Sequence, residues 1–118
     1  MKLPVSVAVL MRNSLLAGGI ASRLQENSHL FQASLLDITD REEMILQLLG
    51  LDPAIIIVDA LDKYLFAQLP LIDLLEIFPQ TRIIQINCAN DDVRVFTSEE
   101  WQAQKTDDLF LKMLEAVT

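Results

Sequence analysis

Two aliphatic runs of strand length limit most strongly what this chain can fold into. Residues 5–11 (VSVAVLM) and 53–60 (PAIIIVDA) are dominated by β-branched and aliphatic side chains with almost no polar interruption. Such runs are typical of strands that are buried on both faces of a parallel sheet. Because a sheet buried on both faces needs helices on each side, the runs predict an α/β domain in which residues 53–60 form the central strand.

Helical patterns follow the first two predicted strands. Asn13 or Ser14 can cap a helix, whose apolar residues recur every fourth position: Leu16, Ile20 and Leu24. Asp40 and Glu43 form an acidic variant of the capping box ahead of a second helix, and Gly50 stands where a left-handed helix end favours glycine. These patterns predict two amphipathic helices.

The middle of the chain supplies two more strands and a third helix. Residues 30–36 alternate apolar and polar side chains, which predicts an edge strand with Leu35 on its drier face. Pro70 suits the first turn of a helix with an apolar stripe, whereas residues 61–69 are interpreted as an irregular apolar connection. Residues 81–87 (TRIIQIN) form the fourth strand.

The spacing of the last two strands determines how they pair. Only the segment CANDD separates residues 81–87 from the next strand-like run, VRVFT, and a parallel crossover needs about a dozen residues or more. Turn formers such as Asn90 and Asp92 favour a hairpin instead. We therefore expect an antiparallel last strand at the sheet edge, followed by a final helix that begins at Thr106 and carries these apolar residues: Leu109, Leu111, Met113, Leu114 and Val117. The whole chain, residues 1–118, is predicted to be one domain with a three-layer αβα architecture.

Composition excludes several classes of function. The net charge is −8 and no Lys/Arg cluster is present, so direct nucleic-acid binding is not expected. No apolar run reaches the roughly 18 residues that a membrane helix needs, which predicts a cytoplasmic domain with no membrane association. The single cysteine, Cys88, is predicted to be a buried structural thiol, and the single histidine, His29, to lie in a surface turn.

The order of these motifs resembles the receiver domains of bacterial response regulators. Three segments carry the resemblance: VLMRNSLLAGGIASRL at residues 9–24, PAIIIVD at residues 53–59 and FPQTRIIQIN at residues 78–87. It covers residues 5 to about 88. The resemblance implies a flavodoxin-like sheet with strand order 2-1-3-4-5, and it places Asp59 at the position of the phospho-accepting aspartate.

Departures from the receiver pattern bear on function. The family's metal-binding acidic pair aligns with Met11 and Arg12, and neither a thioether nor a guanidinium replaces the carboxylate oxygens that Mg²⁺ prefers. Asn87 stands in place of the hydroxyl residue after the fourth strand, the lysine after the fifth strand has no clear counterpart, and the fourth helix is missing. We therefore expect no metal, no cofactor and no catalytic residue.

These observations leave three functions open. The favoured hypothesis is a phosphorylation-independent pseudo-receiver that binds an unidentified signalling protein in bacterial signal transduction or transcriptional regulation, with Asp59 paired to Arg12 or hydrogen-bonded by Asn87. A second is a weak receiver that still accepts phosphate on Asp59. A third is a small-anion sensor in a crevice formed by Arg12, Asp59 and Asn87.

An uncovered edge strand also predicts association. Its free backbone groups and the apolar residues Val95 and Phe96 are available to another chain, which favours a twofold homodimer paired edge to edge. Trp101 is a candidate anchor for a partner, although it could equally cover one end of the core.

Overall fold

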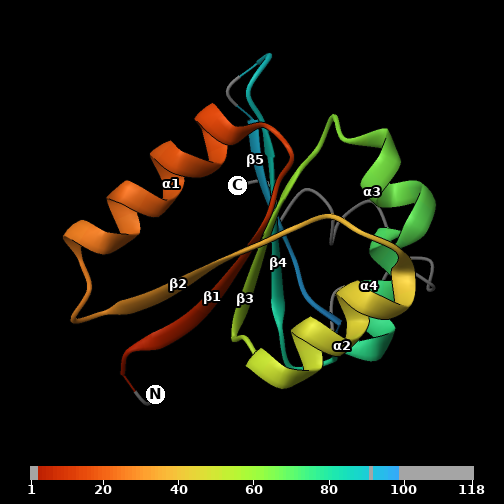
Figure 1. Cartoon of the computed structure of the whole chain (residues 1–118), viewed down its shortest axis with the longest axis horizontal. Coiled ribbons are helices and arrows are strands. Elements are labelled where there is room, and N and C mark those ends of the chain that lie inside the picture. The colour runs from red at the N-terminus through yellow and green to blue at the C-terminus, as the bar shows by residue number, and fades with distance from the viewer. Residues whose placement is uncertain (1–2, 91, 99–118) are drawn as a thin grey trace, which may run out of the picture.

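A five-stranded mixed sheet organises the protein in a computed structural model that describes residues 3–90 and 92–98 (Figure 1). The strand order is β2-β1-β3-β4-β5. The strands span Val5–Leu10 (β1), Phe31–Leu36 (β2), Ile55–Asp59 (β3), Arg82–Asn87 (β4) and Asp92–Phe96 (β5). The first four are parallel, and β5 pairs antiparallel with β4. The predicted strand order and terminal hairpin are thus confirmed, with a short turn rather than a helix between β4 and β5.

Helices cover the sheet on both faces. Helix α1 (Ser14–Glu26) lies on one face, and α2 (Arg41–Leu51), α3 (Lys63–Gln68) and α4 (Leu71–Ile77) lie on the other (Figure 1). Asn13 and Asp40 cap α1 and α2 as predicted, each by accepting a hydrogen bond from a backbone N–H three residues later. The result is a layered α/β fold.

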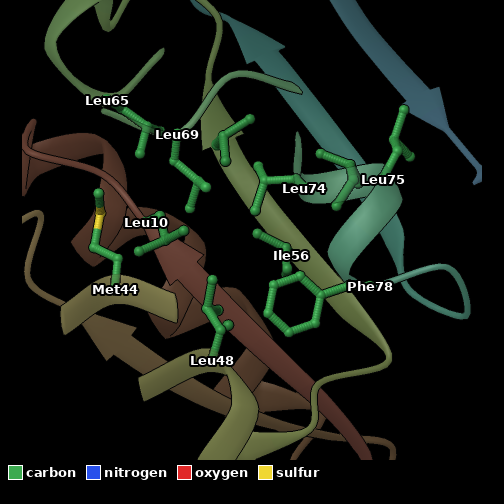
Figure 2. Packing of buried hydrophobic residues seen from close by; sticks show 12 residues of the cluster. Leu10, Met44, Leu48, Ile56, Leu65, Leu69, Leu74, Leu75 and Phe78 are labelled. Carbon is green, nitrogen blue, oxygen red and sulfur yellow. The ribbon is translucent and has the colours of Figure 1, made fainter. Parts of the chain in front are cut away.

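Alternate side chains of the central strands fill two separate cores. Ala8 and Leu10 of β1 and Ile56 and Val58 of β3 face the three-helix side, where they pack with residues such as Leu48 (Figure 2). The other face buries a second set together with Ala17 of α1: Val5, Val7, Val9, Met11 and Ile57. This alternation explains why both strands are aliphatic throughout.

Four local predictions are wrong. The predicted connection at residues 61–69 contains helix α3, capped by Asp62. Helix α2 ends at Asp52, which takes the left-handed conformation (φ 47°, ψ 58°), so Gly50 remains inside the helix. Leu35 is 57% exposed on β2, the strand at the edge of the sheet. Cys88 is exposed because it lies in the β4–β5 turn.

Further predictions concern His29, Trp101, the final helix and membrane association. His29 is exposed as expected. Trp101 and the final helix predicted from Thr106 lie outside the described residues. In the described part of the chain, no helix has the length and apolar character needed to cross a membrane.

Candidate functional site

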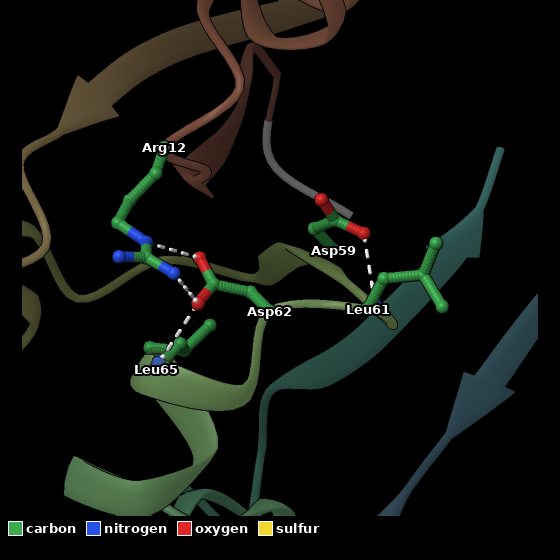
Figure 3. A network of polar contacts seen from close by, with 5 residues as sticks. All are labelled: Arg12, Asp59, Leu61, Asp62 and Leu65. Atoms are coloured by element: carbon green, nitrogen blue, oxygen red, sulfur yellow. Dashed lines mark hydrogen bonds and ion pairs between the residues drawn. The ribbon is translucent and has the colours of Figure 1, made fainter.

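The candidate site lies at the carboxyl ends of the central strands. Arg12 follows β1, Asp59 is the last residue of β3, and Asp62 stands at the start of α3 (Figure 3). Open α/β sheets bind their ligands in a crevice at the carboxyl ends of the strands. The chain therefore gathers charged side chains where this architecture commonly carries function.

Arg12 and Asp62 form a two-point ion pair. The Arg12 Nε donates to Asp62 Oδ2 at 3.0 Å, and Nη2 donates to Oδ1 at 2.8 Å (Figure 3). The guanidinium carbon also lies 4.9 Å from the ring centroid of Tyr64, within the range of a cation–π contact. Both contacts use the planar shape of the guanidinium, which fixes its orientation.

Asp62 connects this ion pair to the fold. Its Oδ1 also accepts a hydrogen bond from the backbone N–H of Leu65 at 3.0 Å, which caps α3. The Asp62 side chain is 3% exposed, whereas the Arg12 side chain is 54% exposed. The carboxylate is therefore a buried anchor, and the guanidinium lies over it at the surface.

The electrostatics of the pair favour the charged forms. Burial alone raises the pKa of the Asp62 carboxyl, but the hydrogen bonds from Arg12 and Leu65 outweigh that effect and hold the pKa below its usual value. The hydrogen bond to Asp62 raises the pKa of Arg12, and the charge of Asp59 adds to this increase. Arg12 and Asp59 thus interact electrostatically without forming the predicted pair.

Asp59 has a local partner instead. It is 9% exposed, and its Oδ1 accepts a hydrogen bond from the backbone N–H of Leu61 at 2.9 Å (Figure 3). A carboxylate that binds the N–H two residues ahead is a common turn-forming device. The pairing predicted for Asp59 with Arg12 is wrong because Asp62, which sequence reasoning had placed in an irregular loop, binds the guanidinium.

Asn87 also bonds within its own turn. Its Oδ1 accepts from the backbone N–H of Ala89 at 3.0 Å, and within the described residues no hydrogen bond joins Asn87 to Asp59. Asn87 lines a small polar hollow of about 230 Å³ beside the β4–β5 turn. Its predicted hydrogen bond to Asp59 is therefore wrong.

A larger pocket of about 540 Å³ opens beside Arg12, between α1 and β2. Met11 and Arg12 line it together with Gly18 of α1, Leu35 of β2 and Asp37, which follows β2. Met11 is 8% exposed and packs in the core beneath α1. Of the four predicted site residues, this pocket contains two, Met11 and Arg12.

Asp62 is the site residue that sequence reasoning missed. The pattern Asp-Lys-Tyr-Leu at residues 62–65 places a capping side chain three residues before a buried leucine, which is a recognised helix-start signal. The helix that it starts has only six residues, so its apolar periodicity was too short to detect.

The predicted interaction residues lie in different environments. Val95 is 37% exposed on β5, whereas Phe96 packs against the three-helix core. Within residues 3–90 and 92–98, no cluster of three His, Cys, Asp or Glu side chains could hold a metal ion.

Comparisons of the chain with protein-family models, with curated proteins and with solved structures find no match.

Proposed function

We propose that this chain is a pseudo-receiver: a flavodoxin-like, receiver-type domain that acts by binding another protein and does not depend on phosphorylation. Its setting is bacterial signal transduction or transcriptional regulation in the cytoplasm. The strand order 2-1-3-4-5 and the position of Asp59 at the end of the central strand support the receiver-type assignment. The turn between β4 and β5, with no helix, supports its divergence from a switching receiver.

The Arg12–Asp62 ion pair is the observation that carries this proposal. A divalent cation beside Asp59 requires oxygen ligands, but the residues after β1 supply a buried thioether and a guanidinium. Asp62 binds that guanidinium at two points and keeps it at the carboxyl end of β1, the strand that pairs with β3. Mg²⁺ assists phosphoryl transfer by neutralising charge. A site that does not bind Mg²⁺ therefore does not support phosphorylation of Asp59. Intact-mass analysis after exposure to a phosphodonor tests the proposal, and no phosphate adduct is expected.

Strand β5 is the surface through which we propose that the domain binds its partner. In the described part of the chain, β5 pairs only with β4, so its outer backbone groups have no strand partner. Val93, Arg94 and Val95 are all exposed along it. A second copy can pair with the same edge by twofold symmetry, which extends the sheet across two chains.

Edge pairing predicts association that depends on concentration. In sedimentation across a dilution series, the mass should rise from the monomer value of 13.3 kDa toward twice that value. Hydrogen exchange should slow in parallel at backbone amides of β5. The opposite edge, β2, provides an internal control whose exchange should not change. A monomer at every concentration, or association that protects β2 instead, would contradict pairing through β5.

A further inference from the structure

The pocket of about 540 Å³ beside Arg12 is lined mainly by apolar side chains. They come from β1, α1 and β2 and from the residues that follow β2: Val9, Met11, Ala17, Leu35, Leu36 and Ile38. Leu35 is more than half exposed there, so an apolar ligand would remove its surface from water. The volume is within the range of pockets that hold small molecules, and the carboxyl ends of strands are where open α/β sheets bind them.

Two side chains of opposite charge, Arg12 and Asp37, line the same pocket. Arg12 binds Asp62 through Nε and Nη2, so its Nη1 group makes no hydrogen bond within the described residues and points away from Asp62 (Figure 3). Asp37 is exposed and takes part in none of the ion pairs in the described part of the chain. The pocket therefore offers one occupant both a set of cationic N–H donors and a carboxylate.

This combination of groups matches a small zwitterion with an apolar body. A guanidinium binds carboxylates through its N–H groups, and a carboxylate accepts hydrogen bonds from an ammonium group. A ligand with a single charge would leave either Arg12 or Asp37 without a counterpart. Free amino acids with aliphatic side chains carry an ammonium group, a carboxylate and an apolar group in one molecule of suitable size.

We propose that the pocket between α1 and β2 binds a free aliphatic amino acid. Its carboxylate accepts hydrogen bonds from Arg12, its ammonium group donates to Asp37, and its side chain packs against Leu35 and Met11. Asp62 is a positioning residue here, because it fixes the orientation of the guanidinium. The pocket lies beside β2, at the opposite edge of the sheet from β5, so this site does not depend on the proposed edge pairing.

An NMR titration of the isotope-labelled full chain with L-leucine tests the site. We expect saturable shifts of the backbone amides of Gly18 and Asp37, and no shifts at Val93 and Val95 on β5. Two analogues separate the charges, because isocaproate lacks the ammonium group and isopentylamine lacks the carboxylate. Each should bind about tenfold more weakly than L-leucine, since each loses a hydrogen bond between charged groups. No saturable shift with L-leucine, or equal affinity for all three compounds, would overturn the proposal.

A substitution at Asp37 tests which group of the ligand it binds. Asp37→Asn keeps the size of the side chain and removes its charge. It should weaken the binding of L-leucine about tenfold and leave the affinity for isocaproate unchanged, because isocaproate has no ammonium group. An equal loss of affinity for the two compounds would show that Asp37 does not recognise the ammonium group.

Two neighbouring glycines of α1 provide a matched pair of variants. A Cβ added at Gly18 or at Gly19 would meet no atom within 4 Å, and leucine is the better helix former at both positions, so both variants should fold. Gly18 lines the proposed site, whereas Gly19 lines a different hollow on α1. We expect Gly18→Leu to abolish the L-leucine shifts by filling the pocket, and Gly19→Leu to preserve them. Binding that survives Gly18→Leu would place the ligand elsewhere and refute the site.

Discussion

Replacing Leu48 with alanine is expected to lower the free energy of unfolding by about 2–5 kcal/mol. Leu48 is fully buried on α2, within the core that faces β1 and β3 (Figure 2). Truncation removes apolar contacts and leaves a cavity, because the strands beneath α2 cannot collapse to fill it. Urea unfolding followed by circular dichroism measures the loss.

A matched substitution on the same helix separates packing from helix propensity. Leu46 is also on α2 but is 68% exposed, so Leu46→Ala should change stability by no more than about 0.5 kcal/mol. Both variants replace leucine with alanine in one helix, so burial is the main difference between them. Similar losses in the two variants would contradict the assignment of the buried face of α2.

Removing the Asp62 side chain gives the second large effect. Asp62→Ala deletes the cap of α3 and leaves the N–H of Leu65 without its partner in a buried position, so we expect a loss of about 1–3 kcal/mol. Asp62→Asn keeps a capping oxygen and removes the charge, and it should cost less. Asp92→Ala is the control, because the ion pair of Asp92 with Arg94 is exposed and should contribute little.

The pH dependence of the Asp62 variants follows from the direction of the pKa shift. The folded-state pKa of Asp62 lies below its ordinary value of about 3.9. The charged carboxylate therefore contributes stability that is present above about pH 4 and is lost as the pH falls through the folded pKa. The stability difference between the unmodified chain and Asp62→Asn should shrink in urea titrations below pH 4. A difference that stays constant with pH would show that the charge of Asp62 contributes nothing.

Much of the fold could be predicted because local preferences and burial agree. The aliphatic runs of β1 and β3 are buried on both faces, and the short CANDD segment permits only a hairpin. The prediction failed where the sequence signal was weak, or where two nearby residues suited the same position. Helix α3 is too short for clear periodicity, and the end of α2 depends on one residue, Asp52, in a left-handed conformation that Gly50 seemed better suited to adopt.

The site was harder to predict because it depends on which of two nearby carboxylates binds one guanidinium. Sequence order placed Arg12 and Asp59 at the ends of adjacent strands, and the structure confirms this placement. In the turn after β3, Asp59 accepts a hydrogen bond from the backbone N–H of Leu61. Asp62, at the start of α3, accepts a hydrogen bond from Arg12. These orientations arise from loop geometry, which strand patterns do not encode.

Intact-mass analysis of the full chain, after incubation with Mg²⁺ and an acyl phosphate, tests the central claim most directly. Asp59→Ala, treated in the same way, identifies any modification at Asp59. Because the residues after β1 are Met11 and Arg12, which supply no carboxylate oxygen for a divalent cation, we predict an unchanged mass for both proteins. A phosphate-sized adduct on the unmodified chain that is missing from Asp59→Ala would contradict the pseudo-receiver assignment and make Asp59 a functional phospho-acceptor.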